Sequence, residues 1–170
     1  MYDVAIIGGG PAGDTLARLI EEKYRVLLVD KRHLINSPES SLSRKCCGGL
    51  LAPDAQRMLS KLGLGLPKAV LEEPQLFVVR AIDIQQKLEG YYQRHYINMN
   101  RPKFDRWLLS MVPSGVDIRL NCQLKSYTLE NDFFSLTLLQ ENKTYVEKTR
   151  ILVGADGASS RVRAQSFPKN

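Results

Sequence analysis

The feature that most constrains the fold of this chain is a glycine-rich turn near its start. The run DVAIIG, residues 3–8, is short, apolar and β-branched, which predicts a buried strand. Gly8, Gly10 and Gly13 then form the pattern G-x-G-x-x-G, and the segment that follows has the apolar spacing of a helix. A second apolar run at 25–30 completes a strand–helix–strand unit. Such a unit favours a parallel sheet with a right-handed crossover.

The position of the glycines indicates a nucleotide site. In such a turn the first glycine permits the tight bend, the second lets the backbone approach a pyrophosphate, and the third lets helix and strand pack closely. The start of the helix offers free N–H groups and partial positive charge to phosphates. Asp30 ends the second strand, where an acidic residue is expected to bind a ribose hydroxyl. The alternative is an ordinary strand-to-helix turn with Asp30 on the surface.

The rest of the chain predicts antiparallel structure around this unit. The segments 75–85 and 88–99 alternate and are rich in aromatic and β-branched residues, so we expect two strands of an antiparallel lobe, packed by Tyr91, Tyr92 and Tyr96. A helix begins near Pro53, and another, with Pro102 in its first turn, spans 101–112. Further strands are expected at 116–121, 123–131, 133–140, 143–149 and 150–157. The runs at 123–131, 133–140 and 143–149 predict a three-strand meander.

Composition limits the class of partner. The 170 residues are 44% hydrophobic and 25% charged, as in an ordinary globular protein. The net charge is +6, but the basic residues are scattered, so we expect no nucleic-acid partner and rather an anionic cofactor or substrate. The N-terminus has neither the pattern of a signal peptide nor that of a membrane span. Three cysteines without an export signal predict a cytoplasmic protein.

The stretch KCCGGLLAP, residues 45–53, places two cysteines beside two glycines. Neighbouring Cα atoms lie about 3.8 Å apart, closer than a disulfide usually spans, so a bridge between Cys46 and Cys47 is disfavoured. A structural zinc site needs four ligands, and only Cys122 and two histidines remain, so we predict no metal site. Two interpretations stay open, a plain glycine-rich turn and a loop that lines a reactive pocket.

Four motifs together resemble one group of flavoproteins. GGGPAG is typical of FAD-binding oxidoreductases, and ILVGADGASSRVR, residues 151–163, resembles the Asp-Gly fingerprint of the p-hydroxybenzoate-hydroxylase-like superfamily. KCCGGLLAP and NRPKFDRWLL, residues 100–109, are similar to the K-x-C-G-G-x-L-S-P and R-x-x-F-D-x-W-L stretches of the geranylgeranyl reductase family. The resemblance covers nearly the whole chain. It implies an α/β fold, a Rossmann-like parallel sheet of the FAD/NAD(P)-binding type with an antiparallel meander and part of a small antiparallel substrate lobe.

The resemblance also implies the residues of a cofactor site. The glycine turn would hold the FAD pyrophosphate, Asp30 the adenosine ribose, and Arg101 the cofactor from the start of its helix. Lys31 and Arg32 face either a phosphate or solvent. Cys47 takes the family's cysteine position near the flavin and is the predicted catalytic residue. The predicted cofactor-binding residues are Gly8, Gly10, Pro11, Ala12, Gly13, Asp30, Lys31, Arg32, Lys45, Cys46, Gly48, Arg101, Gln123, Leu124, Asp156 and Gly157.

The predicted organisation is an FAD-binding domain at 1–65 and 101–164 with a partial substrate lobe at 66–100. Enzymes of this superfamily are longer and carry a third, Gly-Asp fingerprint, which nothing here matches. We therefore expect the N-terminal portion of an oxidoreductase that passes hydride from NAD(P)H through FAD to a small hydrophobic substrate, such as a prenyl chain. The alternatives are an FAD-dependent aromatic hydroxylase and a truncated, non-catalytic nucleotide-binding module. A peripheral contact with lipid or membrane stays open.

Overall fold

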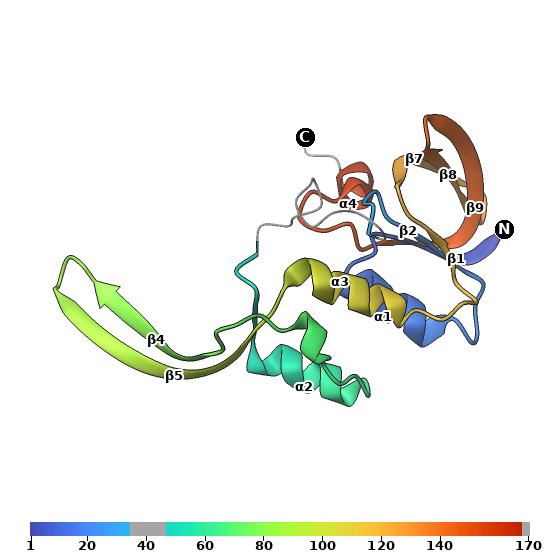
Figure 1. The fold of residues 1–170 in the computed structure, drawn as a ribbon. Coiled ribbons are helices and arrows are strands. Elements are labelled where there is room, and N and C mark those ends of the chain that lie inside the picture. Colours follow the sequence, from blue (N-terminus) through green and yellow to red (C-terminus); the bar gives the residue numbers. More distant parts are fainter. Residues whose placement is uncertain (35–46, 168–170) are drawn as a thin grey trace. The chain divides into compact units, whose positions relative to one another are not determined.

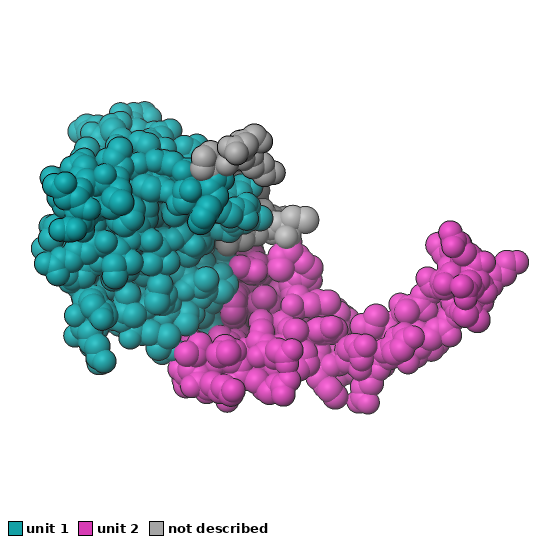
Figure 2. Space-filling model, turned by 180° about the vertical axis from the view of Figure 1, so that it is seen from behind, with its two compact units in different colours: residues 1–43, 105–170 teal, residues 44–104 magenta. Residues whose placement is uncertain are grey.

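The computed structural model describes residues 1–34 and 47–167 and divides the chain into two compact units. Unit 1 comprises residues 1–43 and 105–170, and unit 2 comprises residues 44–104; Figure 2 colours them teal and magenta. The division falls within helix α3 (Arg101–Ser110). By compactness, residues 44–65 group with the second unit. Compactness does not say which residues hold a cofactor, so the predicted domain assignment stays a prediction.

Unit 1 is built on a six-stranded sheet of order β6-β2-β1-β9-β8-β7 (Figure 1). Strand β1 pairs in parallel with β2 and with β9, and β2 pairs in parallel with β6, whereas β7, β8 and β9 are antiparallel. The strands are β1 (Tyr2–Ile7), β2 (Val26–Val29), β6 (Asp117–Arg119), β7 (Cys122–Glu130), β8 (Phe133–Gln140) and β9 (Lys143–Gly154). The predicted fold class, a Rossmann-like parallel sheet with a three-strand meander, is confirmed.

Strand β9 serves both parts of this sheet. Its first half pairs with β8, from Lys143 opposite Gln140 to Thr149 opposite Phe134, and its second half runs parallel to β1. The sequence predicted two strands here, at 143–149 and 150–157, and the structure replaces them with one. The hairpin before it turns through Glu141 and Asn142, whose φ angles are 49° and 62°. Positive φ at both central residues is the geometry that suits the right-handed twist of a hairpin.

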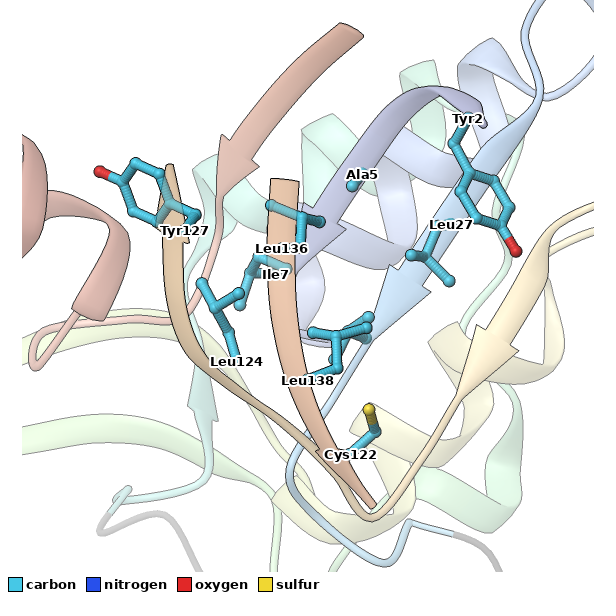
Figure 3. Close-up of a cluster of buried hydrophobic side chains, with 10 residues drawn as sticks. Tyr2, Ala5, Ile7, Leu27, Cys122, Leu124, Tyr127, Leu136 and Leu138 are labelled. Carbon is cyan, nitrogen blue, oxygen red and sulfur yellow. The ribbon is translucent and has the colours of Figure 1, made fainter. Parts of the chain in front are cut away.

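The parallel strands are covered on both faces. Helix α1 (Pro11–Ile20) contributes Ala17 to a cluster with Val4, Ile6 and Leu28 of β1 and β2. The opposite face, which carries Ala5, Ile7 and Leu27, packs against side chains of β7 and β8 (Figure 3). The members contributed by the meander strands are Cys122, Leu124, Tyr127, Leu136 and Leu138. Residues 4–7 of β1 and 26–29 of β2 alternate between the two faces and so contribute to two separate cores.

Unit 2 contains a three-stranded antiparallel sheet of order β3-β5-β4. Its strands are β3 (Leu50–Leu51), β4 (Leu76–Asp83) and β5 (Leu88–Asn98), and the unit also holds helix α2 (Pro53–Lys61) and a 3₁₀ turn at Lys68–Val70. Every residue of β4 is exposed. The expectation that Tyr91 and Tyr92 pack this lobe is wrong, because their side chains are 65% and 50% exposed. Within the described part of unit 2, helix α2 contacts β5 through Gln56, whose Nε2 donates to the carbonyl of His95 at 2.7 Å.

Candidate cofactor site

The glycine turn joins the end of β1 to the start of α1, and its shape depends on glycine at two positions. Gly8 has φ +112°, and a Cβ there would lie 2.4 Å from the carbonyl oxygen of Ala155. A Cβ on Gly13 would lie 1.9 Å from the carbonyl oxygen of Gly8. Both distances are far below van der Waals contact, so only glycine fits. The first and third glycines therefore have the steric roles that the sequence assigned to them.

Helix α1 begins in a way that suits an anionic ligand. Gly10 is its N-cap, no side chain caps the helix there, and Pro11 is its first residue. The N–H groups at the start of a helix lack partners inside the helix, and the helix dipole favours negative charge at that end. Ala12 in this turn is exposed. The turn therefore fits a phosphate group, as the sequence predicted for Pro11, Ala12 and their glycine neighbours.

Asp30 follows β2 and lies against the same turn. Its Oδ2 accepts the N–H of Gly9 at 2.7 Å, and the residue is 5% exposed. Its backbone N–H donates to the carbonyl of Arg119 at 2.9 Å, and its own carbonyl accepts from Cys122 at 3.0 Å. The carboxylate is therefore held at the carboxyl end of the parallel strands, where ligands bind in open α/β sheets.

Arg32 turns toward Asp30, while Lys31 is exposed. The Arg32 guanidinium donates to Asp30 Oδ2 at 2.9 Å and to Asp105 Oδ2 at 2.7 Å, and its Nη2 also donates to the carbonyl of Gly9. Burial acts to lower the pKa of Arg32, but hydrogen bonds and charge from Asp30 and then Asp105 outweigh it and raise the pKa. Arg32 is thus a fixed cation in an ion-pair network.

The Asp-Gly pair follows β9 on the other side of the turn. A Cβ on Gly8 would lie 2.8 Å from the Cα of Asp156, so these two backbones are in contact. Asp156 Oδ2 accepts the N–H of Arg161 at 2.7 Å. Asp156 Oδ1 is buried and has no hydrogen-bond partner among the described residues. Such an oxygen needs a donor, and a bound cofactor would provide one. Gly157, at φ +84°, supplies the bend that follows.

Gln123 and Leu124 lie at the start of β7, which the bond between Cys122 N–H and Asp30 O brings close to Asp30. The side chain of Leu124 is 3% exposed and belongs to the core. Only backbone groups of Leu124 are therefore available to a ligand. Gln123 is half-buried.

The remaining predicted residues belong to unit 2 or lie outside the described residues. Arg101 Nη1 lies 3.9 Å from the sulfur of Cys47, which is an exposed free thiol. The structure thus brings together two residues that the sequence singled out 54 positions apart. A Cβ on Gly48 would meet nothing within 4 Å, whereas Gly49 has φ +71° and a Cβ there would lie 2.6 Å from Met99 O. Lys45 and Cys46 are among the residues that the structure does not describe.

Asp105 is the residue of this site that sequence reasoning missed. It lies in the stretch NRPKFDRWLL, whose resemblance to geranylgeranyl reductases implies no role for Asp105 itself. Its partner Arg32 is 73 positions away. The signal was present in part, since Asp105 is a charged residue on an apolar helix face beside Phe104 and Leu108, both buried.

Among residues 1–34 and 47–167, no group of three metal-ligating side chains occurs.

Comparison with known families decides which cofactor this geometry serves. A family model described as "FAD binding domain" matches residues 1–167. The chain belongs to the FAD-binding domain family. This confirms the resemblance to FAD-dependent oxidoreductases and supports FAD as the cofactor. In the part of the chain that the structure describes, no helix is both long and apolar enough to traverse a lipid bilayer.

Curated relatives that match this chain are longer than it is. Protein CbrA of Escherichia coli strain K12 is 42% identical over 167 residues, which are 98% of this chain and 46% of that protein. Protein CbrA of Shigella flexneri serotype 5b is also 42% identical, over 98% of this chain and 45% of that protein. The chain therefore spans less than half the length of these relatives.

Solved structures confirm the fold. A geranylgeranyl bacteriochlorophyll reductase-like protein from Thermoplasma acidophilum gives a TM-score of 0.72 at 23% identity, covering 92% of this chain and 39% of that chain. The flavin-dependent monooxygenase PieE, solved with FAD and substrate, gives 0.74 at 19% identity, covering 97% and 32%. At these identities the likeness is one of fold. The same fold occurs in a reductase-like protein and in a monooxygenase.

Proposed function

We propose that this chain holds FAD for an oxidoreductase whose substrate is a small hydrophobic molecule. In this proposal residues 1–65 and 101–164 form the FAD-binding domain and 66–100 part of the substrate lobe. The observation that carries the FAD site is the arrangement around the glycine turn. Three features flank that turn: the start of α1, which no side chain caps, the carboxylate of Asp30, and Asp156 Oδ1, which has no hydrogen-bond partner among residues 1–34 and 47–167.

Each of these groups has a distinct task in the proposed site. The N-terminus of α1 binds the pyrophosphate, because its N–H groups and dipole favour an anion. Asp30 binds the adenosine ribose, and Asp156 accepts a hydrogen bond through Oδ1. The backbone at Gln123 and Leu124 contacts the adenine, and Arg101 contacts the cofactor. Bound FAD would supply the hydride chemistry, since the cofactor carries the reaction and the protein positions it.

The electron donor in this proposal is NAD(P)H, and the acceptor is a hydrophobic double bond, such as one in a prenyl chain. The resemblance of KCCGGLLAP and NRPKFDRWLL to geranylgeranyl reductases supports this class. An aromatic hydroxylase is the second candidate. It is favoured by the likeness in fold to the monooxygenase PieE and to aklavinone-11 hydroxylase, which was solved with FAD and aklavinone.

The direct test is FAD binding by the purified chain. We expect one FAD per chain, seen as the flavin absorbance bands and as quenched flavin fluorescence in a titration, and bleaching by NAD(P)H without oxygen. Asp156→Ala should weaken FAD binding, because it removes the oxygen that awaits a donor. Asp132→Ala is the matched control, since Asp132 is exposed in the turn between β7 and β8. A colourless protein that takes up no flavin would favour the non-catalytic module instead.

A second test concerns the two adjacent thiols. Cys47 is exposed and lies near Arg101, so in this proposal it faces the flavin and substrate. We expect Cys47→Ala to alter the reduction potential of the flavin or its anaerobic reoxidation by a prenyl acceptor, while Cys46→Ala has a mild effect. Reoxidation by the prenyl acceptor or, in the presence of oxygen, hydroxylation of an aromatic substrate separates the two candidate reactions. Equal effects of the two substitutions would refute the role of Cys47.

A further inference from the structure

The carboxylate of Asp30 has no acceptor position to spare. A carboxylate offers about four such positions, two on each oxygen. Oδ1 accepts the backbone N–H of Arg32 at 2.7 Å and its Nε–H at 3.1 Å. Oδ2 accepts the N–H of Gly9 at 2.7 Å and the Nη2–H of Arg32 at 2.9 Å. A ribose hydroxyl that binds Asp30 must therefore replace one of these donors.

The donor that is easiest to replace is Nε of Arg32. Its single N–H is shared between Oδ1 at 3.1 Å and Oδ2 at 3.3 Å, the two longest contacts that Asp30 makes. Good hydrogen bonds between an arginine and a carboxylate are about 2.7–2.9 Å long. The contacts from Gly9 N–H and from the Arg32 backbone N–H fall in that range. Replacing the Nε donor by a hydroxyl therefore costs Asp30 its weakest hydrogen bonds and leaves the stronger ones intact.

Asp105 keeps the guanidinium in place during such an exchange. Its Oδ2 accepts Nη1–H of Arg32 at 2.7 Å, and the two side chains are 3% and 12% exposed. Nη2 of Arg32 also donates to the carbonyl of Gly9. With its Nε contacts released, Arg32 would still be tied to helix α3 and to the glycine turn. The Nε–H of Arg32 would then point at the hydroxyl that replaces it as a donor to Asp30.

We propose that Asp105 is a positioning residue, which holds Arg32 so that Arg32 and Asp30 together recognise a ribose hydroxyl. The inference rests on the proposed FAD function and names its adenosine end. The hydroxyl donates its hydrogen to Asp30, and its oxygen accepts the freed Nε–H of Arg32. Both partners of the hydroxyl are thus satisfied, and the site selects a sugar that carries hydroxyls over one that lacks them.

The test compares two nucleotides that differ only in those hydroxyls. ADP and 2′,3′-dideoxy-ADP share the adenine and both phosphates, and each can be titrated against the whole chain by calorimetry. We expect the wild-type chain to bind ADP about tenfold more tightly, the value of one charge-assisted hydrogen bond. A wild-type chain that binds both nucleotides equally overturns the proposal.

The variants ask whether Asp105 produces that preference. Asp105→Asn and Arg32→Lys should each bring the two affinities together, mainly by weakening ADP. A purely structural role would weaken both nucleotides alike and leave their ratio unchanged, which would overturn the inference. Arg80→Lys is the matched control, because Arg80 makes a two-point pair with Glu89 at 2.8 and 2.7 Å on the exposed hairpin. It should keep the tenfold ratio.

One measurement uses the wild-type chain, and a variant is needed only to assign the Arg32 signal. In a ¹H–¹⁵N spectrum of the wild-type chain, the Nε–H resonance of Arg32 should shift on addition of ADP and stay in place with 2′,3′-dideoxy-ADP. Equal shifts with both nucleotides would exclude the exchange at Nε. Failure of FAD and of ADP to bind the wild-type chain at all would overturn the proposed function together with this inference. Binding of both without discrimination overturns the inference alone.

Discussion

The sheet of unit 1 and the hairpin of unit 2 are made of similar residues and reach opposite degrees of burial. In β1 and β2, Ile6, Leu27 and Leu28 are 0% exposed. In β4 and just beyond it, Phe77, Ile82 and Ile84 are 65%, 56% and 85% exposed. Both segments read as β-branched or aromatic strands. What separates them is the number of layers, since the sheet of unit 1 has α1 on one face and the meander on the other.

The comparison shows that an apolar strand is buried only where the fold supplies a second layer. Two paired strands alone are marginally stable, and β4 and β5 are joined by backbone pairing and by the exposed pair of Arg80 and Glu89. The proposed FAD site belongs to the covered region. Gly8, Asp30 and Asp156 are held by strand ends that two cores fix in place. Substitutions of the same kind should therefore have very different effects in the two regions.

The largest difference is expected for alanine in place of glycine. Gly13→Ala puts a methyl group 1.9 Å from the carbonyl of Gly8, where neither backbone can yield cheaply. Gly65→Ala in unit 2 meets nothing within 4 Å. We expect the first variant to lose at least about 3 kcal/mol of unfolding free energy, or the folded state itself, and the second to change by less than about 0.5 kcal/mol.

Urea unfolding followed by Trp107 fluorescence measures this directly. Trp107 is the one tryptophan of the chain and belongs to unit 1. Unfolding midpoints that coincide for Gly13→Ala and the wild type would show that the turn is looser than the structure describes. FAD binding by the same variant gives a second measurement, since a displaced turn would also disrupt the proposed pyrophosphate site.

The next difference concerns apolar side chains in strands. Leu28→Ala in β2 removes a fully buried side chain and leaves a cavity, which costs about 2–5 kcal/mol. Ile82→Ala in β4 truncates a side chain that is 56% exposed, so we expect less than about 1 kcal/mol. Guanidinium unfolding, followed by one spectroscopic probe in each unit, measures the stability costs of the two substitutions separately. A cost at Ile82 that equals the cost at Leu28 would mean that the hairpin is covered in solution, and sedimentation would then reveal self-association.

A smaller difference is expected from tyrosine titration. Burial and a hydrogen bond to Asp117 raise the pKa of Tyr2 to about 12 from the ordinary value of 10.0. Because the folded state holds this proton more tightly, the stabilisation is complete below pH 10 and is lost as the pH rises through 12. Two pKa units correspond to about 2.7 kcal/mol, which screening by solvent reduces to about 2 kcal/mol. In the hairpin, Tyr91 is 65% exposed and donates to Glu89, which also raises its pKa, but solvent weakens the coupling.

Urea unfolding between pH 9 and about 12 tests this assignment. We expect Tyr2→Phe to flatten the loss of stability above pH 10, while Tyr91→Phe leaves the wild-type curve unchanged. Other groups titrate in this range, so the difference between the curves of variant and wild type is the quantity to compare. Parallel curves for Tyr2→Phe and wild type would place the Tyr2 hydroxyl in solvent.

The local parts of the fold could be predicted from sequence, whereas contacts between distant residues could not. The strand, the glycine turn and the helix of residues 3–20 each follow from the spacing of neighbouring residues. The union of 143–149 and 150–157 into β9 did not, because nothing in the sequence distinguishes one long strand from two in register. The burial of Tyr91 and Tyr92 was wrongly predicted, since alternation says which residues share a face and not whether that face is covered.

The candidate site divides in the same way. The glycines and Asp30 could be placed because one motif of known spacing contains them all. The pair of Arg32 and Asp105 joins a strand end to a helix 73 positions later, and ion pairs at such a distance leave no pattern in the sequence. The contact between Gly8 and Asp156 required the parallel pairing of β1 and β9, which brings their carboxyl ends together.

The smallest effect is expected for the exposed ion pair. Arg80 and Glu89 meet at 2.7 Å on the hairpin with side chains 56% and 38% exposed, whereas Arg32 and Asp105 meet at the same distance with 12% and 3%. Surface pairs are screened by water and salt, so Arg80→Gln should leave the unfolding midpoint unchanged at any salt concentration. Arg32→Gln removes the buried cation that Asp30 and Asp105 share and should cost about 3–5 kcal/mol. Thermal unfolding of both variants at low and high salt is the measurement. Equal losses of stability in the two variants would show that geometry alone sets the strength of an ion pair in this protein. Unequal losses would show that burial sets it.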